Sequence, residues 1–218
     1  DDDVIAAASF TDALLVDLRT EGTVNVNGAI FSTNVTTVGA GTGLIDPFSQ
    51  VQANGDEQGY NTDAITDNEP DPGNEILGNA GIGNTNFIHS LLLSSIPVEI
   101  VDGVAYRRFE LDINEPDSAG GELLSLDSVQ IWQANVGDLN NYVPGTTPDQ
   151  GTGLFPAGSA TQIYDLDDGG DRFIGLNGTL QAGSGNTVDM SFLVPNSLFD
   201  ASTPYIYLYS AFGYQGSS

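Results

Sequence analysis

Hydrophobic residues recur in short runs along the chain, and most of these runs alternate with polar residues in the two-residue period of a β-strand. In two segments, Thr23–Phe31 and Val98–Ile113, a pair of such runs is separated by Asn27-Gly28 or by Asp102-Gly103. These dipeptides supply the two positive-φ positions of a type I′ turn. Both segments therefore predict β-hairpins.

Further strands are predicted where apolar and aromatic residues alternate between turn residues: Leu124–Trp132, Gln162–Leu166, Arg172–Leu180, Thr187–Val194 and Tyr205–Phe212. Two segments, Ser9–Leu18 and Phe87–Leu93, fit either a strand or helical structure. Two others, Gly55–Asn86 and Asn135–Gly158, are rich in turn residues and are expected to be long loops. The pattern predicts an all-β fold: a single-domain β-sandwich, jelly-roll-like, with long Asp/Asn/Gly-rich loops.

The first residues do not follow the hairpin pattern. We expect an N-terminal arm at residues 1–12 and a β-sandwich domain at 13–218. After three aspartates the arm has an apolar run that suits a donor strand on the sheet edge of a neighbouring subunit, although a first strand of its own sheet or a tail fits it as well. The assembly residues expected in it are Val4, Ile5, Ala6, Ala7, Ala8 and Phe10.

Composition narrows the function. The 218 residues include 30 acidic residues, four arginines and no lysine, for a formal net charge of -26. Such a charge argues against nucleic acid as a partner, and no apolar run is long enough for a membrane span. There is no cysteine and one histidine, which leaves no thiol chemistry and no multi-histidine metal centre. Because the carboxylates repel one another, bound divalent cations would stabilise the fold, and calcium is the expected cofactor.

Two acidic segments are candidate calcium sites, because carboxylate and amide oxygens near glycine or proline turns are the ligands this ion prefers. The first is Asp165–Asp171, at the end of a predicted strand, and the second is Glu110–Asp117. For the first segment an acidic hairpin turn is the alternative interpretation. The expected ligands are Asp165, Asp167, Asp168 and Asp171 in the first segment and Asp112, Asn114, Glu115 and Asp117 in the second.

The second segment has an enzymatic interpretation as well. Its Glu-x-Asp-x-x-Glu pattern resembles the active-site strand of retaining jelly-roll glycosidases, which would make Glu110 the nucleophile and Glu115 the acid/base. Strand parity places these two glutamates on opposite faces unless a bulge intervenes, and Pro116 ends the strand at once. A sugar cleft also favours several tryptophans, and the chain has one. We therefore do not expect an enzyme.

The aromatic residues leave one further alternative. Trp132 and the tyrosine-rich segment Tyr205–Tyr214 would suit stacking on sugars, as in a carbohydrate-binding module, or burial in a core or interface. The single histidine, His89, is expected to be structural, because no Gly-x-Ser-x-Gly nucleophile turn accompanies it.

Several stretches resemble secreted bacterial proteins that carry PEP-CTERM-type sorting signals. The resemblance implies export to the cell surface or matrix and no established catalytic role. The sorting segment itself, a Pro-Glu-Pro followed by a membrane span and basic residues, is not in this sequence. The matching stretches are Gly41–Phe48, Glu57–Asp63, Tyr106–Glu115, Leu124–Asp127, Tyr164–Asp171, Gly183–Gly185 with Asp189-Met190, and Tyr207–Gly213.

Together these features predict a secreted, extracellular structural protein, stabilised by calcium and self-assembling into a filament, tube or surface layer. Its start at Asp1, with neither methionine nor a basic leader, fits a mature product from which a signal peptide has been removed. Its partners would be other copies of itself. The alternative is a secreted carbohydrate-binding module with glycan partners, and a retaining glycosidase is the weaker variant of that alternative.

Overall fold

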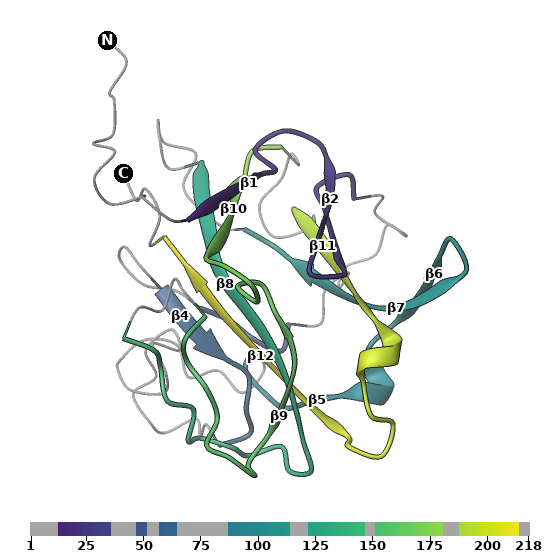
Figure 1. Cartoon of the computed structure of the whole chain (residues 1–218), viewed down its shortest axis with the longest axis vertical. Coiled ribbons are helices and arrows are strands. Elements are labelled where there is room, and N and C mark those ends of the chain that lie inside the picture. The colour runs from purple at the N-terminus through teal and green to yellow at the C-terminus, as the bar shows by residue number, and fades with distance from the viewer. Residues whose placement is uncertain are drawn as a thin grey trace.

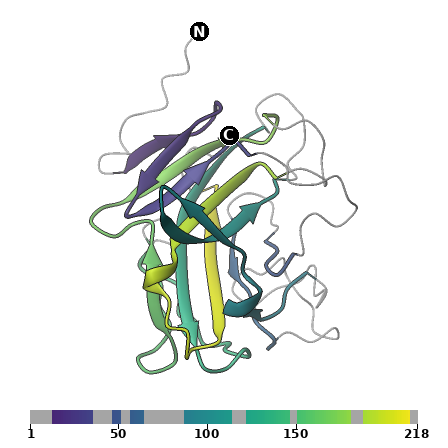
Figure 2. The ribbon, with the colours of Figure 1, turned by 90° about the vertical axis from the view of Figure 1, so that its right-hand side faces the viewer.

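The computed structural model describes residues 13–35, 47–51, 57–64, 87–113, 122–146, 151–180 and 188–213. Within these ranges the chain forms twelve strands in two sheets, with two 3-10 helices of three residues each, η1 (Leu93–Ser95) and η3 (Asn196–Leu198). Figure 1 shows the arrangement of the strands, and Figure 2 shows the same ribbon from the side. The expected all-β sandwich is confirmed, while its jelly-roll-like topology remains a prediction.

The larger sheet has seven strands, and β8 and β12 form its long central pair. Its path runs β1-β10-β8-β12-β4, with β9 added to β8 and β5 added to β12. Only β1 and β10 pair in parallel within this sheet. Its strands are β1 (Leu14–Asp17), β4 (Glu57–Tyr60), β5 (Leu91–Leu92), β8 (Leu123–Ala134), β9 (Thr161–Asp165), β10 (Arg172–Asn177) and β12 (Tyr205–Phe212).

The smaller sheet is antiparallel throughout, in the order β2-β3-β11-β7-β6. Both predicted hairpins lie in it, and both turns have positive φ at their first residue, 51° at Asn27 and 50° at Asp102. Its strands are β2 (Thr23–Val26), β3 (Ala29–Ser32), β6 (Val98–Val101), β7 (Val104–Leu111) and β11 (Met190–Pro195).

The main core lies between the two sheets. In the smaller sheet, Phe31, Phe192 and Phe109 form a stacked row across three strands, with ring centroids 5.4 Å and 5.0 Å apart. Aliphatic residues of the larger sheet complete this core, among them Leu126, Ile131, Ile174 and Ile206. Burial of these apolar side chains is the main term that favours the folded state.

A second, aromatic core covers the opposite face of the larger sheet. Along β12 the residues alternate: Ile206 and Leu208 belong to the main core, whereas Tyr207 and Tyr209 belong to the aromatic core. The segment after β8, expected to be a loop, folds back over this face and joins to itself through a bridge between Val143 and Leu154. The buried members of the aromatic core are Tyr60, Trp132, Ala134, Tyr142, Phe155, Tyr207, Tyr209 and Ala211.

Three segments differ from or refine the prediction. Strand β4 lies inside Gly55–Asn86, which was expected to be a loop, because Glu57–Tyr60 pairs with β12 and places the Tyr60 ring in the aromatic core. The described part of Ser9–Leu18 is a strand, β1. In Phe87–Leu93, strand β5 is followed at once by the turn of η1.

Candidate functional site

The first predicted calcium segment, Asp165–Asp171, is the turn that joins β9 to β10. We call it the acidic loop. Its start is fixed by pairing with β8, where Asp165 lies directly opposite Gln130. Positive φ at Gly169 and Gly170, 81° and 148°, turns the backbone toward β10 in a conformation that other residues rarely adopt.

The backbone carbonyls of the acidic loop accept hydrogen bonds from two side chains. Asn27 Nδ2, from the β2–β3 turn of the other sheet, donates to the carbonyl oxygens of Asp165, Leu166 and Asp168 at 2.9–3.0 Å. Arg172 Nη1 donates to those of Leu166, Asp168 and Gly170 at 2.7–3.3 Å. A guanidinium cation therefore already occupies the carbonyl side of the loop, so metal binding would depend on its carboxylates.

Asp165 and Asp167 bring their carboxylates together beside Gly151. A Cβ at Gly151 would lie 2.6 Å from Asp167 Oδ2 and 2.9 Å from Asp165 Oδ1, so a side chain there would displace these carboxylates, and the φ of 58° also favours glycine. Asp165 is well satisfied, because Oδ1 accepts from the Asp167 amide and Oδ2 accepts from Gln130 and Gln162.

Asp167 is less completely satisfied. Its Oδ1 accepts a hydrogen bond from the Arg172 backbone amide at 2.9 Å, but its buried Oδ2 has no hydrogen-bond partner of acceptable geometry. The pKa of Asp167 is raised to about 8, chiefly by burial; the charges of Asp165 and Asp171 contribute to this rise, while the Arg172 amide and the nearby Ser128 hydroxyl oppose it. Burial raises the pKa of Asp165 as well. At neutral pH, Asp167 therefore needs a proton or a cation on Oδ2.

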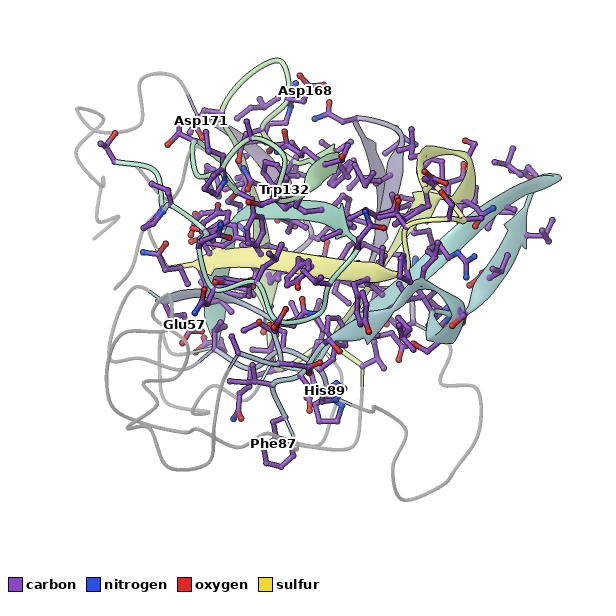
Figure 3. The ribbon with its side chains drawn as sticks, turned by 90° about the horizontal axis from the view of Figure 1, so that it is seen from below. Glu57, Phe87, His89, Trp132, Asp168 and Asp171 are labelled. Atoms are coloured by element: carbon purple, nitrogen blue, oxygen red, sulfur yellow. The ribbon has the colours of Figure 1, made fainter. Side chains whose placement is uncertain are left out.

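The other two predicted ligands of this loop lie differently. The side chain of Asp168 is exposed to solvent, and its contribution to the loop is its backbone carbonyl. Asp171 is half-buried and close enough to raise the pKa of Asp167. Figure 3 shows Asp168 and Asp171 on one side of the sandwich and His89 on the opposite side, so the single histidine takes no part in this site.

The second predicted segment contributes one described residue, Asp112, just after β7. The continuation of the β7–β11 register places it across from Asp189, which was not among the predicted ligands. Asp189 is 4% exposed, and its Oδ2 accepts a hydrogen bond from the Ile113 amide at 2.7 Å. Burial and then the charge of Asp112 raise the pKa of Asp189 to about 6. Asp112 Oδ1 is buried without a hydrogen-bond partner, and burial raises its pKa too.

The structure thus brings together two pairs of carboxylates, Asp165 with Asp167 and Asp112 with Asp189. Each pair has one buried oxygen that lacks a hydrogen-bond partner, which is the kind of atom a hard cation would satisfy. Among the described residues, no group of three or more acidic or histidine side chains has a geometry that could hold a metal ion. Three predicted ligands, Asn114, Glu115 and Asp117, lie outside the described residues.

The described residues on which the glycosidase and carbohydrate-binding alternatives depended, and His89, make contacts within the fold. Glu110 Oε1 accepts a hydrogen bond from Arg108 Nε at 2.8 Å, and Arg108 also bridges to Glu99. Trp132, Tyr207 and Tyr209 are buried in the aromatic core, so these rings offer no exposed platform for a sugar. His89 Nδ1 lies 2.9 Å from the carbonyl oxygen of Ser90, a local backbone contact.

Gln130, Asn27, Arg172, Gly151 and Asp189 were not selected from the sequence. Gln130 is fully buried at the centre of β8, where its Oε1 accepts from Trp132 and Tyr142 and its Nε2 donates to Asp165. The sequence feature that could have identified Gln130 is its place as an uncharged polar residue between the apolar residues Val129 and Ile131. Asn27, Gly151 and Asp189 reach the acidic loop and Asp112 from distant segments of the chain, which a single sequence does not reveal. Arg172 directly follows the acidic loop, but the sequence does not show that its side chain folds back onto the carbonyls of the loop.

The assembly residues expected in the arm, Val4 to Phe10, lie outside the described residues. In the part of the chain that the structure describes, no helix has the length and apolar character needed to cross a membrane.

Comparison with protein-family models, with curated proteins and with solved structures finds no match for this chain. The resemblance to PEP-CTERM-type proteins remains a prediction.

Proposed function

We propose that this chain is an extracellular structural protein whose β-sandwich is stabilised by calcium and which assembles with copies of itself into a filament, tube or surface layer. The observation that supports it most is the pair formed by Asp165 and Asp167 beside Gly151, where the carboxylate of Asp167 lies near the Ser128 hydroxyl but its buried Oδ2 accepts no hydrogen bond of acceptable geometry. Asp112 and Asp189 repeat that arrangement in the other sheet.

Electrostatics supports the cation. With a formal net charge of -26, every folded or assembled state brings many negative charges together. Two carboxylates in contact are destabilising unless a proton or a cation lies between them, and calcium takes the place of that proton. Water molecules and backbone carbonyls would complete the coordination shell, since calcium takes about six to eight oxygen ligands.

The expected role of Asp167 gives a matched pair of variants. Asp167→Asn and Asp168→Asn make the same substitution in the same loop, but only the first removes a carboxylate from the pair at Gly151. Thermal unfolding is measured with EDTA and with increasing calcium, alongside calorimetric titration of calcium itself. Calcium at one hundred times its Kd stabilises the native state by about 2.7 kcal/mol, which corresponds to a rise in Tm of roughly 5–11 °C for a chain of this size.

We expect that rise in the wild type and in Asp168→Asn, and the loss of most of it in Asp167→Asn. Identical melting curves of the wild type in EDTA and calcium would contradict the cation. Equal losses in both variants would mean that calcium only screens the general charge. Sedimentation velocity of the same samples tests the assembly, because a chain that remains monomeric in calcium would not be a self-assembling protein.

A further inference from the structure

The strand β6 forms an open edge of the smaller sheet. It pairs with β7 alone and has no partner on its other side among the described strands. The β6–β7 hairpin projects away from the rest of the sandwich (Figures 1 and 3). Edges of this kind are templates on which another strand can pair.

The register of the hairpin shows which backbone groups face outward. The two-residue turn at Asp102-Gly103 closes on Val101 and Val104, and the Arg108 amide donates to the Pro97 carbonyl at 3.0 Å. Hydrogen-bonded pairs alternate with non-bonded pairs in an antiparallel ladder. The N–H and C=O groups of Val98 and Ile100 therefore point away from β7, toward the open edge.

The same two residues have the exposed side chains of β6. Val98 is 51% exposed and Ile100 is 64% exposed, the largest fraction among the described large hydrophobic residues. The register places Glu99 on the opposite face, where it is paired with Arg108. Proteins commonly protect such edges with lysine, bulges or proline. Here the chain has no lysine, the β6–β7 pairing has no register shift, and proline occurs only before the strand, at Pro97.

We infer that the open edge of β6 accepts the apolar part of the N-terminal arm, residues 4–8, from a second copy of the chain. The inference rests on the self-assembly proposed above and names its interface. Twelve residues precede Ala13, enough to reach roughly 40 Å when extended. The segment Val4–Ala8 contains no charge, glycine or proline, so it is able to pair along a strand and cover Val98 and Ile100.

Two further observations favour a neighbour's arm as the occupant. The arm joins the fold at β1, on the opposite side of the molecule from β6 (Figure 1), so the contact is between unlike surfaces. A contact of this type can repeat from copy to copy, and it generates an open filament wherever its rotation does not close into a ring. Arg107 lies opposite Val98 at one end of the edge, where its guanidinium donates hydrogen bonds to Asn196 Oδ1 and to the carbonyl oxygens of Leu93 and Ile96. No described carboxylate forms an ion pair with it, so its positive charge is not neutralised and would attract Asp1–Asp3 at the start of the arm.

The absence of cysteine makes the inference testable by cross-linking, because every introduced thiol is unique. One preparation of the full chain carries Ala6→Cys or Ala7→Cys, which between them sample both faces of the arm. A second carries Ile100→Cys on the edge, and the matched control carries Val104→Cys, an exposed position of the same hairpin on the other face. The arm and hairpin variants are mixed in calcium, treated with a short bis-maleimide and separated under denaturing conditions.

We expect an efficient heterodimer of an arm variant with the Ile100→Cys chain and at least fivefold less with the Val104→Cys chain. Ordered polymers without this cross-link would overturn the β6 interface and leave self-assembly standing. Equal cross-linking of both hairpin variants would mean random collision and would overturn it too. If the double variant with Ala6→Cys and Ile100→Cys cross-links only within one chain, the arm binds the β6 edge of its own molecule, and the contact between copies would be overturned. Monomers without any cross-link would contradict the proposed function itself.

Discussion

Replacement of Asp167 by asparagine should stabilise the protein at alkaline pH. Asparagine has the shape of a protonated aspartic acid, so its oxygen would accept from the Arg172 amide and its NH2 would donate on the side of Asp165. It removes the need for Oδ2 to take up a proton or a cation. The variant therefore separates the electrostatic cost of this carboxylate from its place in the loop.

The magnitude follows from the raised pKa of Asp167, about 8 in the folded chain against 3.8 as the ordinary value. A carboxyl group whose pKa is raised on folding contributes stability that is fully present below its pKa in the unfolded chain. That contribution is lost as the pH rises through its pKa in the folded chain. The slope is about 1.4 kcal/mol per pH unit, which gives roughly 3–4 kcal/mol between pH 5 and pH 8. Because this carboxyl is only partly shielded from water, we expect about 1–3 kcal/mol.

The assay is urea unfolding at pH 5 and pH 8 in EDTA, followed by the fluorescence of the buried Trp132. The wild type should lose stability over this interval, and Asp167→Asn should lose about 1–3 kcal/mol less. Asp168→Asn is the control, because it makes the same substitution at an exposed position of the same loop. Parallel pH dependences of the wild type and Asp167→Asn would refute the reasoning, and calcium should flatten the wild-type dependence.

Three further predictions concern stability. Asn27→Ala should lower the free energy of unfolding in urea by about 2–4 kcal/mol, because it removes the three hydrogen bonds from Asn27 to the acidic loop. Asp102→Ala is the control, because Asp102 has nearly the same positive φ in the other hairpin turn, and it should lower that free energy by only about 1 kcal/mol; equal losses would contradict the role of Asn27. Phe155→Ala should cost about 3–5 kcal/mol through loss of packing in the aromatic core, and a cost below 1 kcal/mol would show that this segment is not part of the fold. Asp189→Asn should stabilise the protein by about 1 kcal/mol more at pH 8 than at pH 5, because burial raises the pKa of Asp189 to about 6 and makes its ionised form unfavourable. A pH profile that matches the wild type would contradict the cost of burying this charge.

The fold was predictable from the sequence where local chemistry dominates. Asn27-Gly28 and Asp102-Gly103 have the φ values that a type I′ turn requires, and strand β12 has the predicted bounds, Tyr205–Phe212. Strand β4 was not predictable, because Glu57-Gln-Gly-Tyr60 has few β-forming residues and is a strand only through its pairing with β12. Its tertiary context overrides its local propensity.

The candidate site was predictable only in part. The sequence selected Asp165 and Asp167, with Asp168 and Asp171, as ligands of one site, and the carboxylates of Asp165 and Asp167 lie together beside Gly151. Their neighbours Gly151 and Gln130 come from other segments, so the buried oxygen of Asp167 follows from tertiary packing. The guanidinium of Arg172 binds the carbonyl oxygens of the loop, where a metal ion would otherwise bind them. Nothing local in the sequence distinguishes Arg172 from a surface arginine.

Negative-stain electron microscopy of the purified chain, with calcium added and then removed by EDTA, tests the central claim most directly. The proposal predicts ordered polymers in calcium that dissolve in EDTA, because the cation offsets the charge of -26 within and between copies. Dispersed particles of uniform size under both conditions would contradict it.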